Sequence, residues 1–390
     1  MRESDVFRRR LAHASALSPR SAWCRLFALF ALLTLSLPAQ ANATIIVPLS
    51  EDALVEDAAA IVVGRVGTIR GGYDHRRATI FTNITVALEE IIKGTIADGQ
   101  ITLRQPGGSF GDLHAWIMGS PHFTVGEKVL LFLRVDREGA LRVAHLYQGK
   151  FTISVDAISG EEYASRETPA GVHTLRNTTP DPSQMAIQTE RQHLQELKDR
   201  IRSHLRNTPS QRPSQLSPLA LSPAEAADIT TGAIQEEFTF MGPARWFEPD
   251  SNNPVTMVMN STGEPLAPTN GFDQIRQAFQ AWSGVPGSTF HYQDGGFTDA
   301  VGFQRDGINT VSFGDPLGDM DPPTHCSGTL AVGGFFFTSS QTRTINGTAF
   351  SRITEGDLVF NDGWAGCNFY ENFANFAEVA TQPGRDRTSW

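Results

Sequence analysis

The chain has 390 residues, of which 40% are apolar and 19% are charged, and its formal net charge is −10. This length leaves room for two or three domains, and the composition supplies enough apolar side chains for packed cores, which excludes a largely disordered chain. The negative charge argues against nucleic acids and anionic membrane surfaces as partners.

The first 43 residues have the order of a secretory signal peptide. Six arginines and only two acids lie among them, and Arg25 is followed by a short apolar run that ends in small residues near Ala41. This order is typical of export, and the run is too short for a good transmembrane helix. We therefore expect cleavage after residues 1–43, an extracellular or periplasmic location and no membrane segment afterwards. A buried N-terminal helix is the alternative.

Export also decides how the cysteines are interpreted. Cys24 lies in the signal peptide, which leaves Cys326 and Cys367 in the mature chain. Two cysteines in an exported protein predict a disulfide. The alternatives are two free buried thiols or a zinc pair, although two thiolates alone do not fill a tetrahedral zinc site.

Residues 44–205 form a predicted β-rich N-terminal domain. Its strands are rich in Val, Ile and Thr and are separated by glycines, which indicates a small barrel or sandwich. The predicted strands are residues 60–69, 78–92, 100–104, 128–135, 141–146 and 151–155. Their order resembles the small barrel of netrin-like and metalloprotease-inhibitor domains, which is of the oligonucleotide/oligosaccharide-binding (OB) type. Four histidines of this region show no ligand spacing, so we expect them on the surface: His75, His114, His122 and His145.

Residues 184–205 form a predicted amphipathic helix that packs on the barrel or binds a partner. Its apolar residues recur at helical spacing; they are Ile187, Leu194, Leu197, Ile201 and Leu205. Residues 206–228 are rich in Pro and Ser, which indicates an exposed linker. This linker is either an ordinary tether or a site where a protease separates the two domains.

Residues 229–390 form a predicted α+β domain with a mixed sheet and one long helix. One helix face is apolar, with Phe272, Ile275, Ala278, Phe279 and Trp282, and the predicted strands are residues 256–260, 310–313 and 357–360. Five acids are predicted in loops, where they are either solvated or ligands for calcium: Asp315, Asp319, Asp321, Asp357 and Asp362. His291 and His325 are the only histidines here and do not make a site by themselves.

Six segments of this domain, in this order, resemble the catalytic domain of a bacterial matrixin-like protease, a zinc metalloprotease of the metzincin group. The segments are residues 244–260, 272–292, 306–315, 326–337, 356–364 and 376–381. The resemblance implies a mixed sheet with one long helix, a catalytic zinc, and hydrolysis of a protein or peptide substrate by a zinc-activated water.

The zinc motif of that family, H-E-x-x-H-x-x-G-x-x-H, is not met. It places three histidines around one zinc and a glutamate as general base. Directly after Thr381, Gln382 and Asp386 stand at the first two histidines, Pro383 at the glutamate and Ser389 at the glycine. Pro383 should also end the helix that begins near Phe369. We therefore expect a family member cut short before its zinc helix, with no catalytic residue, no metal ligand and no bound cofactor.

Two hypotheses follow. The first is an exported matrixin-type zinc metalloendopeptidase that is inactive in this chain. The alternative is a non-catalytic secreted binding protein that works through its N-terminal β-barrel. The sequence contains no phosphate loop, no Gly-x-Ser-x-Gly elbow and no Cys/His nucleophile pair.

Overall fold

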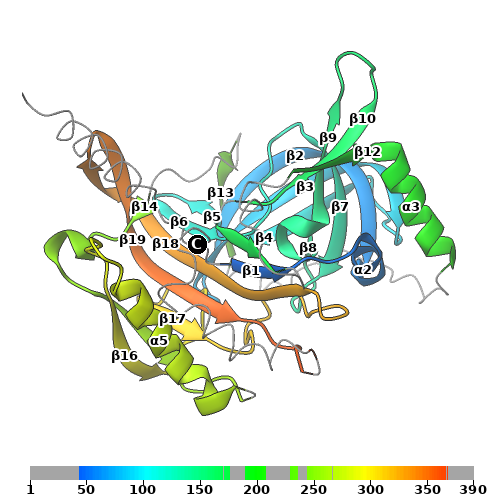
Figure 1. The fold of residues 1–390 in the computed structure, drawn as a ribbon. Coiled ribbons are helices and arrows are strands. Elements are labelled where there is room, and N and C mark those ends of the chain that lie inside the picture. Colours follow the sequence, from blue (N-terminus) through cyan, green and yellow to red (C-terminus); the bar gives the residue numbers. More distant parts are fainter. Residues whose placement is uncertain are drawn as a thin grey trace, which may run out of the picture. The chain divides into compact units, whose positions relative to one another are not determined.

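The computed structural model describes residues 44–169, 171–175, 189–207, 229–235, 244–265, 267–365 and 367. These residues lie in one compact unit. They form mixed α+β structure that consists mostly of strands, which confirms the α+β part of the predicted fold class (Figure 1). The predicted signal peptide, residues 208–228 of the linker and the predicted helix from Phe369 lie outside the described residues.

The described residues form two sheets and three α-helices. The nine-stranded sheet contains β2 (Ala60–Asp74), β3 (Thr79–Lys93), β4 (Gln100–Pro106), β7 (Lys128–Val135), β8 (Leu141–Val143), β9 (Lys150–Val155), β10 (Glu162–Glu167), β12 (Thr189–His193) and β13 (Ile229–Gln235). The ten-stranded sheet contains β1 (Thr44–Val47), β5 (Gly108–Phe110), β6 (Leu113–Ile117), β11 (Val172–Thr174), β14 (Ala244–Arg245), β15 (Val255–Asn260), β16 (Tyr292–Thr298), β17 (Thr310–Ser312), β18 (Gly328–Ile345) and β19 (Thr348–Phe360). The α-helices are α2 (Glu51–Asp57), α3 (Leu194–Asn207) and α5 (Phe272–Ser283), and short 3₁₀ helices span Leu146–Gly149, Glu248–Ser251 and Pro268–Gly271.

Five strands of the nine-stranded sheet pair in a ring. The pairs β2–β3, β3–β4, β7–β8 and β2–β7 are antiparallel, and β4–β8 is parallel. Because side chains alternate between the two faces of a strand, one face of each strand supplies a shared core that includes Val62, Val86, Leu103, Val129 and Val143. Five of the predicted strands correspond to β2, β3, β4, β7 and β9, and the predicted strand 141–146 is shorter, ending as β8 at Val143.

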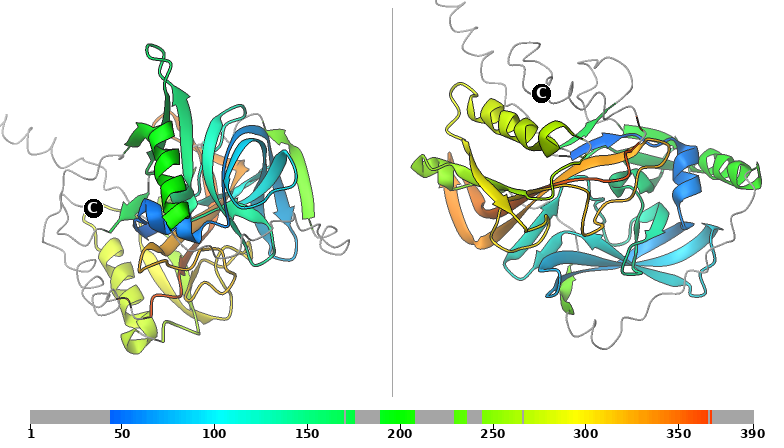
Figure 2. Two further views of the ribbon diagram at one scale, coloured as in Figure 1. Left: turned by 90° about the vertical axis from the view of Figure 1, so that its right-hand side faces the viewer. Right: turned by 90° about the horizontal axis from the view of Figure 1, so that it is seen from below.

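The other face of this sheet packs against α2 and α3, which lie side by side (Figure 2). Leu194, Leu197 and Ile201 of α3 are buried, as their spacing predicts. The predicted helix 184–205 is wrong over Thr189–His193, which pairs as β12 with β10. The spacing of apolar residues within this segment could not reveal the pairing, because the hydrogen-bond partners of an edge strand lie in another segment of the chain.

The two sheets exchange strands across the predicted linker. β1 and β6 come from the N-terminal region and both pair with β18. β1 lies beside residues 328–331 of that strand, and β6 lies beside residues 334–338. In the other direction, β13 follows the linker and pairs with β2. Strand pairing thus joins the two regions. Their division into separate domains, 44–205 and 229–390, stays a prediction.

The C-terminal half of the ten-stranded sheet has the strand order β16-β15-β17-β19-β18. The first four strands are parallel, and β18 is antiparallel to β19. α5 connects β15 to β16 and packs on one face, where Ile275 contacts a core that includes Met257 and Val311. The predicted helix and strands of this region are confirmed, except that Trp282 is 40% exposed and does not join the core.

Cys326 and Cys367 are joined, with Cα atoms 5.6 Å apart, which agrees with the predicted disulfide. The bond ties the chain after β19 to the segment before β18. Among the described helices, none has the length and apolar character needed to cross a membrane.

Candidate functional site

The carboxyl ends of four parallel strands meet at one edge of the ten-stranded sheet. Asn260 ends β15, Phe313 follows β17, Asp299 follows β16 and Asp362 lies shortly after β19. The chain passes from β15 to β16 on one side and then returns to β17 on the other side of β15. Such a switch point between parallel strands leaves a crevice beyond their carboxyl ends, which is where open α/β sheets bind ligands.

A cleft of about 630 Å³ lies at this edge. Residues that follow β15, β16, β17 and β19 form its lining. They are Asn260, Thr262, Gly263, Glu264, Pro265, Asp299, Val301, Phe313, Gly314, Pro316, Asp362, Gly363, Trp364 and Ala365. We call this feature the cleft.

The lining combines carboxylates with apolar side chains. Glu264, Asp299 and Asp362 supply the acids. The rings of Phe313 and Trp364 are buried behind the surface, and the accessible apolar lining comes from Pro265, Val301 and Pro316. Among the described lining residues there is no Lys, Arg or His. The cleft therefore favours a ligand that carries positive charge on an apolar stem.

Asn260 shapes the rim of the cleft after β15. Its Nδ2 donates to the carbonyl of Ala300 at 2.8 Å, and its Oδ1 accepts from the backbone N–H of Thr262 at 3.0 Å. The turn that follows needs Gly263, which has a φ of +64° and whose added Cβ would lie 2.7 Å from Cβ of Asn270. Any side chain at position 263 would therefore displace this rim.

The wall after β17 is a loop that we call the cleft loop, residues 314–321. Asp315 organises it: its carboxylate accepts from the backbone N–H groups of Asp319 and Met320, both at 2.9 Å. Its own N–H donates to the carbonyl of Phe360 at 3.0 Å, which fixes the loop to the end of β19. Asp315 is 1% exposed, and burial, with a smaller contribution from the charge of Asp319, raises its pKa to about 6.

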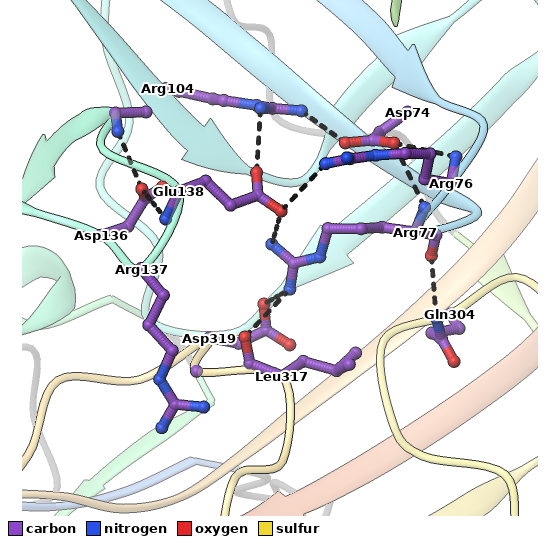
Figure 3. Close-up of polar contacts among 12 residues, drawn as sticks. Asp74, Arg76, Arg77, Arg104, Asp136, Arg137, Glu138, Gln304, Leu317 and Asp319 are labelled. Carbon is purple, nitrogen blue, oxygen red and sulfur yellow. Dashed lines mark hydrogen bonds and ion pairs between the residues drawn. The ribbon is translucent and has the colours of Figure 1, made fainter. Parts of the chain in front are cut away.

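Two arginines from the N-terminal region contact the inner side of the cleft loop. Arg77 Nη2 lies 2.6 Å from Asp319 Oδ1, and Arg142 Nη2 lies 2.6 Å from Asp321 Oδ1. Figure 3 shows the Arg77 contact together with the ion pairs around it. Burial would raise the pKa of Asp321, but the charge of Arg142 is the largest opposing cause and the pKa is lowered on balance.

A second pair of buried acids lies on β19. Glu355 accepts from the N–H groups of Asp306 and Gly307 at 3.2 and 2.8 Å, and Asp357 accepts from those of Phe303 and Thr310 at 3.0 and 2.9 Å. Burial raises the pKa of Glu355 to about 7. Burial and then the charge of Glu355 raise the pKa of Asp357 well above its usual value. These acids fold the segment before β17 and do not line the cleft.

The structure corrects several expectations about polar residues. Asp315, Asp321 and Asp357 are 1%, 5% and 5% exposed, so the expectation of solvated loop acids is wrong for them. Asp357 lies within a strand. Asp362 is exposed at the cleft.

The histidine expectation is confirmed for His75 and His122, which are exposed, and wrong for His145. His145 is buried, with Nε2 2.7 Å from Asp57 Oδ2. His114 is half-buried, and its Nδ1 lies 2.7 Å from Ser109 Oγ.

The zinc that the family resemblance implies does not fit the residues of this chain. In the part of the chain that the structure describes, no three His, Cys, Asp or Glu side chains are grouped so that they could hold a metal ion. The five acids that were predicted as alternative calcium ligands belong to this part of the chain. At the motif positions outside the described residues, a glutamine, a proline and a single aspartate do not make a catalytic donor set.

Comparisons of the chain with models of known protein families, with curated protein sequences and with solved structures found no significant match.

Proposed function

We propose that this chain is an exported, matrixin-like protein whose cleft binds an extended peptide without hydrolysing it. The proposal is supported by the mixed sheet with one long helix, which is the architecture that the resemblance implies. Export is supported by the signal-like N-terminus, and the Cys326–Cys367 pair is compatible with an oxidising compartment.

The position and lining of the cleft carry the proposal. It lies at the switch point between β15 and β17, and its rim is built from the ends of four strands. A cleft of this volume accommodates one or two side chains together with their backbone. Asp299 and Asp362 favour lysine or arginine among the bound peptide side chains, and the apolar surface of Pro265, Val301 and Pro316 suits their aliphatic stems.

Hydrolysis is not part of the proposal because the chemistry of a matrixin needs zinc ligands and a general base. The residues at the positions of those groups are Gln382, Asp386 and Pro383. A proline has no proton-accepting side chain, and one carboxylate does not hold a catalytic zinc.

The experiment is a binding measurement with the mature chain and two labelled nine-residue peptides, one of alternating Lys and Leu and one of alternating Glu and Leu. Fluorescence anisotropy should show binding of the Lys peptide and much weaker binding of the Glu peptide. The double variant Asp299→Asn/Asp362→Asn should lower the affinity for the Lys peptide by about three- to tenfold, as expected for the loss of two exposed charges. The matched control is Asp98→Asn, an exposed acid remote in sequence from the lining. Equal affinity for both peptides would contradict the proposed ligand class.

The ring of five strands supports the second candidate, a binding protein that works through an OB-type barrel. A closed five-stranded arrangement with one parallel pair suits such a barrel, whose surfaces bind oligosaccharides, oligonucleotides or proteins. The acidic chain disfavours oligonucleotides. A ligand that protects amides of β3 and β4 from hydrogen exchange, and not amides near Asn260 and Phe313, would favour this candidate over the cleft.

A further inference from the structure

The cleft loop has two sides that face different parts of the protein. Gly314 and Pro316 line the cleft, whereas the buried carboxylate of Asp315, between them, is turned to the N–H groups of the loop itself. The inner side of the loop meets side chains that precede it by more than 170 residues. The shape of this cleft wall therefore depends on residues that belong to the N-terminal region.

Arg77 holds the middle of the cleft loop. It lies in the turn between β2 and β3, and its Nη2 donates to Asp319 Oδ1 at 2.6 Å. The same turn contacts a second segment of the C-terminal region, because the carbonyl of Ala78 accepts from the N–H of Arg305 at 2.6 Å. Burial lowers the pKa of Arg77, but the charges of Asp319 and Glu138 outweigh burial and raise it. Arg77 is therefore charged at every physiological pH.

Arg142 holds the end of the cleft loop. It lies on β8, and its side chain is 12% exposed. Nη1 donates to the carbonyls of Gly318 and Asp319 at 3.3 and 2.9 Å, and Nη2 donates to Asp321 Oδ1 at 2.6 Å. One guanidinium thus fixes three polar groups of the loop, which the planar donor geometry of arginine allows and a lysine ammonium does not.

A chain of ion pairs fixes Arg77 in turn (Figure 3). Arg77 Nη1 lies 3.7 Å from Glu138 Oε1, and Glu138 Oε2 accepts from Arg104 Nη1 at 3.2 Å. Arg104 Nη2 donates to Asp74 at 2.8 Å, and Asp74 accepts from the N–H of Arg77 at 3.2 Å. The network therefore returns to its starting residue, and it holds the guanidinium toward the cleft loop.

We propose that Arg77 and Arg142 are positioning residues for the cleft: they hold the cleft loop in the conformation that forms the wall after β17. The part of this inference that concerns ligand affinity rests on the proposed function, and the part that concerns the loop does not. Replacing Arg77 removes the guanidinium that is hydrogen-bonded to Asp319. Replacing Arg142 leaves Asp321 with Arg134, whose Nε lies 3.7 Å from Asp321 Oδ1. In either variant the loop then opens to hydrate the carboxylate that has lost its hydrogen-bonded arginine.

The experiment uses the full mature chain and measures hydrogen–deuterium exchange together with affinity for the Lys/Leu peptide. The N–H groups of Asp319 and Met320 are the reporters, because both donate to the Asp315 carboxylate. In Arg142→Gln and Arg77→Gln, exchange in residues 318–321 should accelerate by about tenfold or more, while exchange in β7 should stay unchanged. Peptide affinity should fall by about fivefold, because the loop would form the cleft wall in only a fraction of the molecules and the apparent affinity falls by that fraction.

The matched control is Arg65→Gln on β2, whose ion pair with Glu89 is exposed and which does not contact the cleft loop. Arg142→Lys separates position from charge: it keeps the charge but loses the simultaneous contacts, and it should still accelerate exchange in the loop. If Arg142→Gln fails to fold, Asp319→Asn, which removes the acid from the Arg77 pair, gives the same readout.

Unchanged exchange in residues 318–321, or an equal acceleration throughout the protein, would overturn the inference. If the loop exchanges faster but no variant or parent binds the peptide, the positioning of the loop stands and the proposed function fails. If the peptide binds and its affinity is the same in Arg65→Gln and both arginine variants, the proposed function stands and the inference fails.

Discussion

Arg142 donates to Asp321 at 2.6 Å although the two residues are 179 positions apart in the sequence. Asp321 also accepts from the backbone N–H of His145, and its carbonyl accepts from Asn361 Nδ2 at 2.9 Å. Through its carboxylate and its backbone carbonyl, Asp321 therefore links β8, the cleft loop and the chain after β19. The C-terminal sheet and the N-terminal ring depend on each other through this residue.

Asp321→Asn should destabilise the protein strongly. The amide removes the carboxylate that is hydrogen-bonded to the buried guanidinium of Arg142, and removal of one partner of a buried ion pair costs about 3–5 kcal/mol. Urea denaturation followed by circular dichroism measures this change. Asp98→Asn, at an exposed position, should change the free energy of unfolding by less than about 0.5 kcal/mol. A small effect in both variants would show that the pair is not a stabilising link.

The contribution of the two buried acids of β19 to stability should fall as pH rises from about 5 to about 8. Glu355 has a folded-state pKa near 7, against an ordinary value of 4.5, because burial disfavours its charged form. At Glu355 the folded state therefore binds more protons than the unfolded state in this window, so the contribution of this residue is full below pH 4.5 and is lost as pH rises through 7. Asp357, whose pKa is raised in the same direction, adds to the loss.

Glu355→Gln is the variant that checks this pH dependence. Whatever its effect on absolute stability, it should flatten the dependence of the urea midpoint on pH between 5 and 8. Glu196→Gln, at an exposed position on α3, should leave that dependence as in the parent. A Glu355→Gln variant whose midpoint depends on pH in the same way as the parent's would be inconsistent with the raised pKa of Glu355.

The Cys326–Cys367 bond closes a loop with a sequence separation of 41, which is worth about 4 kcal/mol in the chain-entropy model. The double variant Cys326→Ser/Cys367→Ser should lose about that much stability in urea denaturation. Thiol labelling of the unfolded but unreduced mature chain should detect no free thiol. Two reactive thiols would show that the bond does not form in the exported protein.

Cleavage of the linker should not separate the two halves of the protein. β1 and β6 are paired with β18, and β13 is paired with β2, so backbone hydrogen bonds join the pieces on both sides of the cut. A specific protease site inserted between residues 208 and 228 allows the test. The cut protein should elute from a gel-filtration column with the intact chain and should separate only in denaturant. Two separate peaks in native buffer would support independent domains.

Local chemistry was enough to predict most of the regular structure. Val- and Ile-rich runs between glycines predicted β2, β3 and β7, and the apolar face from Phe272 to Phe279 predicted α5. These elements depend on residues next to one another in the sequence. The short helix α2 was missed, although Ser50 carries the signal: its side chain accepts from the N–H of Ala53 at 3.1 Å, as an N-cap residue does.

The cleft and the strand exchange could not be predicted in the same way. Asn260 and Phe313 stand at the ends of predicted strands, but only the strand order of the sheet shows that these ends lie at one edge. The burial of Asp321 depends on Arg142, and the place of β1 depends on β18, which lies more than 280 residues later. Pairings over such distances leave no periodic trace in the sequence.

The most direct test of the central claim is to incubate the purified mature chain with zinc and the Lys/Leu peptide, and then to measure bound metal and peptide mass. The chain should bind the peptide, hold much less than one zinc per molecule and leave every peptide molecule intact. One tightly held zinc per chain, or peptide cleavage that a chelator abolishes, would contradict the proposal of a matrixin-like cleft that binds without hydrolysis.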